Sequence, residues 1–428
     1  MGSSKIGYLT FNEKPWSNLL RRQVIEVISE SNKLTNKDLI LVSFLPFYEY
    51  LRNRSNISDL NKELQKEGIR FITIPTPFPI PIYTRDRGWI NRWRYDWIRM
   101  LVVLLYSTPF VLYLKFISGI NIFHCRSYPI SVSVLAIKCI SKDIRLIFDP
   151  RSDFPEENIT RRNWSKRSLS YKMWKKLERQ LCIHSDYVIA ISNTYDQHFK
   201  KIYSGVKTKI IPNNVNTNEF SPDQVRDESI REKHDIDEST TLVCYSGSMY
   251  ESLWNNPDEY GCVIEKLLEL NRNLQFMFLI PPDSNELLRK KFHEYNINDE
   301  HYIIENPNFE QVPTLLSQAD LGLYILDNES IRIGTKFVEY CSAGLPTIVN
   351  QNVEGAAEII RKNNLGCEIS LHFNKNNSYC PPESLSKDDS ERIHDIISNS
   401  EEISEDCRQF AKENFDTTII ANSYAKLY

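Results

Sequence analysis

The sequence predicts an α/β protein made of two doubly wound, Rossmann-like domains in tandem. Short apolar runs rich in β-branched residues alternate with amphipathic stretches of helix length, and a polar segment near the middle separates two such series. The chain has 428 residues, which is enough for two or three domains that each bury a core of their own. We therefore expect two parallel sheets, each covered by helices on both faces.

The first series of predicted strands occupies the N-terminal half of the chain. Every predicted strand except the last is followed by a segment of helix or loop length, which is the βαβ pattern of a parallel sheet. We expect this domain to comprise residues 1–215, joined by the chain's last helix at 416–428. The predicted strands lie at 5–11, 38–45, 69–74, 120–124, 144–149, 186–192 and 208–213.

The second series follows a polar connection at residues 215–240 that has little periodicity. Asp235 and Asp237 in this connection form an Asp-x-Asp pattern, which we interpret as a solvated turn and not as a metal site. The second domain is expected to cover residues 216–415. Its predicted strands lie at 241–248, 274–281, 301–305, 319–326 and 345–350.

Composition and missing motifs argue against several classes of protein. Lysine and arginine total 52 against 56 aspartates and glutamates, and the net charge of -4 gives no field that would attract a nucleic acid. The nine cysteines are scattered, without a CxxC pair or a His/Cys cluster, which indicates a reduced, intracellular protein. The P-loop, GxGxxG after the first strand, HExxH and GxSxG motifs are missing, which argues against an NTPase, a dinucleotide enzyme, a zincin and an α/β-hydrolase.

The most informative segment is residues 329–350, ESIRIGTKFVEYCSAGLPTIVN. Arg332 precedes a helix that we expect to begin near Lys336, with Thr335 as its N-cap. Free backbone N–H groups at a helix start, together with these two cations, make a site for a diphosphate. Glu339 follows one turn later, where a carboxylate can accept hydrogen bonds from a ribose diol. The alternative is a surface helix with a Lys–Glu pair.

This segment resembles the family-4 glycosyltransferases of the GT-B fold, specifically a Pro/Gly-x-Lys-x-x-Glu-Tyr subgroup. Members commonly carry PxKxxEYxAxGxPVI in the second domain, matched here by GTKFVEYCSAGLPTIV. SDYVIAIS at 185–192 and IIPNNVNTNEF at 210–220 follow in the family order. The resemblance implies two domains facing across a cleft, a nucleotide-diphosphate sugar held by the second domain, and a retaining reaction that needs no metal or other cofactor.

The chain departs from the family pattern at two places in the second domain. Many members have a Glu-x7-Glu pair, but the first carboxylate would fall at Ile331, and Glu329 is out of register as a replacement. The usual Arg and Lys after the first strand are also missing, since that stretch supplies Gly247 and Ser248 but no cation. We nevertheless expect these two residues to line the donor site with the segment around Lys336.

In the first domain, INIFHCRSYP places His124 at a strand end, where the family has a histidine that faces the donor sugar. A structural hydrogen-bonding histidine is the alternative. Arg126 and Asp149 lie at or near neighbouring strand ends and complete the predicted catalytic set, followed by Arg151. This set can supply a general base for an acceptor hydroxyl or a cation for an acceptor phosphate. A network of arginines and carboxylates that braces the loop is equally compatible.

Residues 85–115 have features of a segment that binds an anionic membrane surface. Five arginines interleave with Trp89, Trp93 and Trp97, and the uncharged run MLVVLLYSTPFVLYL follows at 100–114. Arginines attract anionic lipid and tryptophan favours the headgroup layer. A span needs about 20 apolar residues, so we expect a buried or interfacial helix, with a core helix as the alternative to membrane contact.

The sequence therefore predicts a cytoplasmic glycosyltransferase, peripheral on the inner face of the membrane, that uses a nucleotide sugar and a saccharide or lipid-linked acceptor. Its expected pathway is surface polysaccharide assembly. A nucleotide-sugar 2-epimerase, which shares the GT-B architecture, and a non-catalytic membrane-bound partner of another transferase remain as alternatives.

Overall fold

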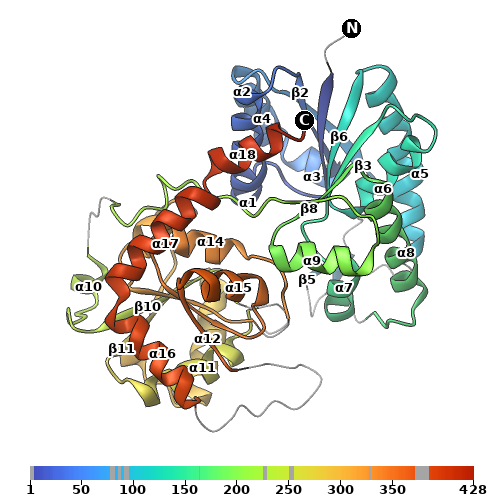
Figure 1. The fold of residues 1–428 in the computed structure, drawn as a ribbon. Helices are drawn as coiled ribbons and strands as arrows, with labels where there is room; N and C mark the ends of the chain where they lie inside the picture. The colour runs from blue at the N-terminus through green and yellow to red at the C-terminus, as the bar shows by residue number, and fades with distance from the viewer. Residues whose placement is uncertain are drawn as a thin grey trace. The chain divides into compact units, whose positions relative to one another are not determined.

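The computed structural model describes residues 4–77, 82–84, 88–90, 96–162, 164–224, 229–249, 255–326, 329–371 and 385–428. The chain forms two compact units: residues 1–211 together with 420–428, and residues 212–419 (Figure 1). The C-terminal residues therefore belong to the same unit as the N-terminus. We call these parts unit 1 and unit 2.

Unit 1 contains a seven-stranded sheet in the order β3-β2-β1-β6-β7-β8-β9, and every neighbouring pair in it is parallel. The strands are mostly buried because helices cover both faces of the sheet. Their bounds are β1 Lys5–Phe11, β2 Leu39–Pro46, β3 Arg70–Thr76, β6 Ile120–Arg126, β7 Arg145–Asp149, β8 Tyr187–Ala190 and β9 Thr208–Ile210. A small antiparallel hairpin pairs β4, Ile82–Thr84, with β5, Gly88–Ile90.

The helices of unit 1 divide between the two faces of its sheet (Figure 1). One face carries α1 (Asn18–Leu20), which continues through a π-helical stretch, Arg21–Glu26, into α2 (Val27–Leu34), and also α4 (Arg54–Lys66) and the end of α18 (Thr417–Ala425). On the other face, α6 (Tyr128–Lys138) packs on β6 and β7, with α5 (Asp96–Phe116) and α8 (Leu169–His184) against it. The remaining helices are α3 Phe47–Arg52, α7 Phe154–Arg162 and α9 Asn193–Ile202.

Unit 2 contains a six-stranded parallel sheet in the order β12-β11-β10-β13-β14-β15. The strands are β10 Thr241–Ser246, β11 Leu274–Leu279, β12 Tyr302–Glu305, β13 Leu321–Tyr324, β14 Thr347–Asn350 and β15 Gly366–Ile369. The helices are α10 Ile230–Lys233, α11 Pro257–Leu270, α12 Asn285–Glu294, α13 Val312–Leu316, α14 Thr335–Ser342, α15 Glu354–Asn363, α16 Lys387–Ser398 and α17 Ser400–Asn414. One continuous apolar core joins the sheet to its helices.

The predicted fold class is confirmed, because two parallel sheets with helices form two Rossmann-like units. Most predicted strands occur within one or two residues of their expected bounds. Strand β15, Gly-Cys-Glu-Ile, was missed because a run of four residues that contains Gly and Glu carries little strand signal. The Asp-x-Asp pattern is a solvated turn, as expected: Asp235 and Asp237 are exposed, and Asp237 accepts hydrogen bonds from the backbone and hydroxyl of Ser239.

Helix α5 contains Pro109 and ends at Phe116. In the described part of the chain, no helix is both long and apolar enough to cross a membrane. The side chains of the tryptophan and arginine segment at 85–99 lie outside the described residues, so the structure adds nothing about them. The eight cysteines in the described residues are all free.

Candidate functional site

Each unit carries its predicted site residues at or near the point where its strand order reverses. The reversal lies between β1 and β6 in unit 1 and between β10 and β13 in unit 2. His124 and Arg126 lie in β6, and Asp149 ends the neighbouring β7. Gly247 follows β10, and the loop after β13 leads into α14. The topology therefore gathers the predicted residues into one group in each unit.

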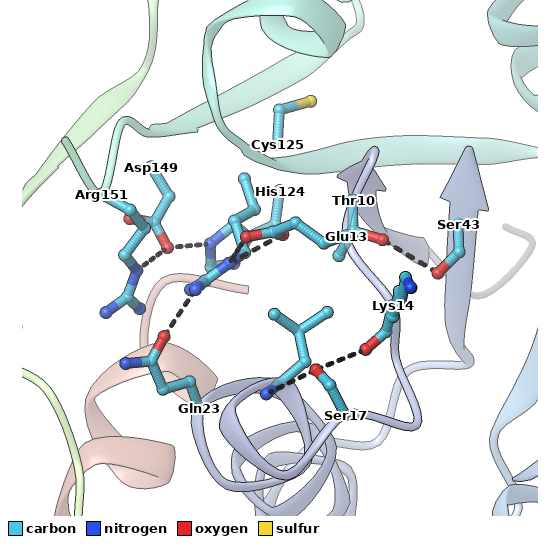
Figure 2. Close-up of polar contacts among 12 residues, drawn as sticks. Thr10, Glu13, Lys14, Ser17, Gln23, Ser43, His124, Cys125, Asp149 and Arg151 are labelled. Atoms are coloured by element: carbon cyan, nitrogen blue, oxygen red, sulfur yellow. Dashed lines mark hydrogen bonds and ion pairs between the residues drawn. The ribbon is translucent and has the colours of Figure 1, made fainter. Parts of the chain in front are cut away.

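Asp149 is the buried anion of the group in unit 1 (Figure 2). Its Oδ2 atom accepts hydrogen bonds from His124 Nε2 at 3.2 Å and from Arg151 Nε at 2.9 Å. Burial raises the pKa of this carboxyl, but the charge of Arg151 and the hydrogen bond from His124 outweigh burial and lower the pKa to about 2. Asp149 is therefore ionised at neutral pH.

His124 is fully buried, and both of its ring nitrogens have partners inside unit 1. Nε2 faces the ionised Asp149, so Nε2 carries the proton. Burial lowers the pKa of His124, so the ring is neutral and Nδ1 accepts a hydrogen bond from the Tyr428 hydroxyl at 2.8 Å. The rings of Tyr8 and Tyr424 lie 4.3 and 5.0 Å from the imidazole, between ring centroids. The alternative expected from sequence, a structural hydrogen-bonding histidine, describes this geometry better than a side chain facing a donor sugar.

Arg126 is also held within unit 1. Its Nε lies 3.0 Å from both carboxylate oxygens of Glu13, and its Nη2 donates to Gln23 Oε1 at 2.6 Å. The charge of Arg126 is therefore balanced by Glu13, as that of Arg151 is by Asp149. The cations predicted for an acceptor phosphate are both paired with carboxylates.

The ends of β1, β6 and β7 have strained backbone. Asn12, Ser127 and Arg151 have φ values of 57°, 78° and 54°. Non-glycine residues in such conformations cost about 1–3 kcal/mol each and concentrate at functional sites. Among the described residues, four buried polar atoms here have no hydrogen-bond partner: Asn12 Oδ1, Arg126 Nη1, Ser127 Oγ and Asp149 Oδ1. Strain and unsatisfied polar atoms together make this edge a candidate functional site.

In unit 2, Lys336 packs against Gly247 and two tyrosines. Its ammonium lies 4.9 Å from the ring centroid of Tyr245 and 5.9 Å from that of Tyr324, as cation–π contacts. Gly247 has a φ of 133°, and a Cβ atom at this position would lie 2.5 Å from Lys336 Cε. Within the described residues, no hydrogen bond or ion pair holds the ammonium. Burial lowers the pKa of Lys336 to about 8, although Glu339 opposes the shift.

The start of helix α14 differs from the prediction. Gly334 is the N-cap, in extended conformation at φ -74° and ψ 152°, and Thr335 is the first helical residue and makes no cap bond. The expectation that Thr335 caps the helix is therefore wrong. A Cβ at 334 would lie 2.3 Å from the Tyr324 hydroxyl, so a larger residue at the cap position would require Tyr324 to move. The free N–H groups of the first turn remain, and the helix dipole adds partial positive charge there.

The loop before α14 is braced by the segment before α15. Ser330 N–H donates to Asn352 at 2.7 Å, Gly355 N–H donates to Ser330 at 3.1 Å, and a Cβ on Gly355 would lie 2.4 Å from the Arg332 carbonyl. Arg332, Thr335 and Glu339 are partly exposed, and Ser248 is exposed. Unit 2 therefore brings the predicted donor residues together around Gly247 and the start of α14. The described residues contain no cluster of three His, Cys, Asp or Glu side chains that could hold a metal ion.

Two family models match the chain, one in each half. Residues 56–219 match Glycosyltransferase Family 4, and residues 226–414 match Glycosyl transferases group 1. The chain is therefore a glycosyltransferase. No curated protein matches the sequence of this glycosyltransferase.

Solved structures share the fold of this glycosyltransferase over its whole length. A glycosyltransferase from Rickettsia africae is 15% identical with a TM-score of 0.66, and the match covers 100% of this chain and 98% of the other. HepE from Anabaena, solved with UDP, is 13% identical with a TM-score of 0.63, and WaaG, a glycosyltransferase of lipopolysaccharide biosynthesis, is 14% identical with a TM-score of 0.56. Both matches cover 99% of each chain. At these identities the likeness establishes the fold alone.

Sequence reasoning missed the groups that hold the unit 1 network. Glu13 and Gln23 come from the loop after β1 and from the π-helical stretch, and no motif marks them. Tyr424 and Tyr428 come from the chain's last nine residues, where Tyr424 Oη accepts from Arg151 Nη2 at 2.5 Å. The sequence signal that could have revealed these two tyrosines is their spacing of four residues, which places both on one face at the end of a helix expected to return to the first domain.

Proposed function

We propose that this glycosyltransferase moves a sugar from a nucleotide-diphosphate donor to a saccharide or lipid-linked saccharide acceptor in cell-surface polysaccharide assembly. The observation that carries the proposal is Lys336, an ammonium without an anionic partner in the described residues, packed against Gly247 at the switch point of unit 2. A diphosphate supplies the missing anion. HepE was solved with UDP and glucose, and a trehalose-6-phosphate protein of E. coli with UDP-2-fluoro glucose, which supports testing UDP-sugars first.

In the proposed reaction the bond between the anomeric carbon and the diphosphate oxygen breaks, and the acceptor hydroxyl oxygen bonds to that carbon. Negative charge develops on the departing diphosphate, which takes up the proton of the hydroxyl. Lys336, Arg332 and the N-terminus of α14 stabilise that charge. Glu339, one turn further along α14, accepts hydrogen bonds from the ribose hydroxyls, and Gly247 and Ser248 allow the donor to approach β10. No metal is needed in this proposal, because protein cations supply the positive charge, and the family resemblance favours retention of configuration.

We propose that His124, Arg126 and Asp149 help to position the acceptor. The first and last are fully buried, and all three are held by hydrogen bonds within unit 1. With a pKa of about 2, Asp149 is a weak base at neutral pH. Because both arginines of the network face carboxylates, we propose a neutral, hydroxyl-bearing acceptor group in preference to a phosphate.

The donor site is tested by measuring the melting temperature of the protein with each of a panel of nucleotide sugars. A ligand that binds only the folded protein raises this temperature. We expect Lys336→Ala and Glu339→Ala to abolish the shift produced by the bound nucleotide sugar and to abolish transfer. The matched control is Lys362→Ala with Glu358→Ala, since these residues form a Lys–Glu pair at 2.6 Å on α15. Unchanged binding and transfer in the first pair of variants would show that the donor site lies elsewhere.

The two other functions give different results in the same system. An epimerase converts its nucleotide sugar without any acceptor, so product formed from UDP-GlcNAc alone would replace the transfer proposal. A non-catalytic partner would bind no nucleotide sugar at all. We expect product only when donor and acceptor are both present.

A further inference from the structure

Helix α5 presents an exposed apolar face that the glycosyl-transfer site does not use. Leu105 is 78% exposed, Phe116 is 65% exposed and Ile117, just beyond the helix, is 71% exposed, while Leu101 and Tyr113 are about half exposed. At roughly 100° per residue, these positions fall within one arc of about 160° on the helix. Ordinary protein surfaces expose apolar side chains singly, whereas these side chains form one contiguous stripe, which is typical of an interaction surface.

The opposite face of α5 belongs to the core of unit 1. Val103, Ser107, Val111 and Leu114 are buried, and the Ser107 hydroxyl shares a hydrogen bond of 2.6 Å with the Ser133 hydroxyl of α6. A helix packed in this way on α6 cannot be surrounded by lipid. The stripe is therefore suited to lie on a surface, not to pass through one.

The apolar surface continues beyond the end of α5. Lys115 pairs with Asp143, which places the loop after α6 beside the C-terminal turn of α5. That loop carries Ile140, which is 82% exposed, and Lys142, which is also exposed. The only charged side chain of α5 between 101 and 116 is Lys115, and it is mostly buried.

The charge of the sequence just before the stripe indicates which kind of surface binds the exposed face of α5. The residues from 85 to 99, just before the stripe, contain five arginines and two aspartates, although the whole chain carries a net charge of -4. Three tryptophans accompany these arginines. A cationic, tryptophan-rich segment followed by an apolar helical stripe complements an anionic lipid leaflet, where arginines meet headgroups and apolar side chains enter the acyl boundary.

Pro109 also favours a position of α5 at the membrane interface over one in the hydrocarbon core. It lies on the exposed side of α5 and has no N–H group, so the carbonyl of Leu105 lacks its usual donor within the helix. Such a carbonyl can bond to water in the hydrated interface, whereas it would have no partner in the hydrocarbon core. We propose that the exposed face of α5, formed by Leu101, Leu105, Tyr113, Phe116 and Ile117, docks the enzyme on an anionic membrane surface at interfacial depth.

Sedimentation with vesicles tests the docking face without any assay of transfer. We expect the wild-type chain to bind vesicles of phosphatidylcholine with phosphatidylglycerol and to bind pure phosphatidylcholine much less, with binding that weakens as salt rises. Leu105→Glu with Phe116→Glu should lower binding to the anionic vesicles at least tenfold. The matched control is Leu169→Glu, at a leucine of α8 that is 60% exposed, and it should bind as the wild type does.

Three results would overturn the proposal. The wild type could fail to bind anionic vesicles, or the double variant could bind them as well as the wild type does. In sedimentation velocity, the wild type could be a dimer and the double variant a monomer. The last result would make a second copy of the chain the occupant of the face. Nucleotide-sugar binding by the double variant should equal that of the wild type, so failure of the docking proposal and failure of the proposed function remain distinguishable.

Discussion

Replacing Lys336 by methionine should make the ligand-free protein more stable while removing its affinity for a diphosphate. Methionine reaches as far as the Cε position that packs over Gly247, but it removes the ammonium that burial destabilises. The pKa of Lys336 is about 8 in the folded state against 10.5 when unperturbed. At about 1.36 kcal/mol per pKa unit this corresponds to about 3 kcal/mol, and the partly exposed side chain reduces the expected gain to about 1–2 kcal/mol.

The sign follows from proton linkage. Below pH 8 both the folded and the unfolded Lys336 are protonated, so the full cost of burying the charge is present. Between pH 8 and 10.5 the unfolded state binds more protons, so the wild type gains stability as pH rises and the advantage of Lys336→Met disappears. A gain of 1–2 kcal/mol in a unit of about 200 residues raises the Tm by about 2–8 °C.

Thermal unfolding at pH 7 and at pH 10.5, with and without UDP, measures both effects. UDP should raise the Tm of the wild type and leave that of Lys336→Met unchanged. Lys362→Met is the control, because this exposed lysine pairs with Glu358 and should change stability by less than about 0.5 kcal/mol. A ligand-free Lys336→Met protein that is less stable than the wild type at pH 7 would refute the reasoning.

Three further outcomes are expected. Gly247→Ala should raise the donor KM at least tenfold, measured by steady-state kinetics, because a Cβ 2.5 Å from Lys336 Cε displaces the ammonium. Asp149→Asn should cost about 2 kcal/mol at pH 7 in urea unfolding, and the wild type should lose this contribution as pH falls from 4 to 2, since the folded pKa of Asp149 is depressed to about 2. Tyr428→Phe should shift the tautomer equilibrium of His124, observed in ¹⁵N NMR spectra, because Nδ1 loses its donor; an unchanged spectrum would contradict the assigned tautomer.

Local patterns were enough to predict the fold but not the contacts of the site. Alternating apolar runs predict parallel strands, and the topological rule then places His124, Asp149 and Gly247 at or near strand ends without any knowledge of packing. The partners of those residues depend on tertiary contacts that have no local signal. The sequence left open whether Arg126 offers a cation to an acceptor phosphate or belongs to an arginine–carboxylate network, and its partner Glu13 lies more than one hundred residues away in sequence. His124 likewise has a partner that no local pattern predicts, because its Nδ1 accepts a hydrogen bond from Tyr428 at the end of the chain.

The two switch points differ in how they handle charge, and this difference bears on which substrate each unit receives. In unit 1 both arginines of the network are matched by carboxylates, and the neutral His124 completes a group without net charge. Among the described residues of unit 2, the partly exposed ammonium of Lys336 faces two aromatic rings, and Glu339 is the carboxylate that acts on it. A balanced group favours neutral hydroxyls, whereas an unneutralised buried cation becomes stable only when an anion arrives. Charge balance, more than the identity of any single residue, is therefore our reason for proposing that unit 1 receives the acceptor and unit 2 the diphosphate.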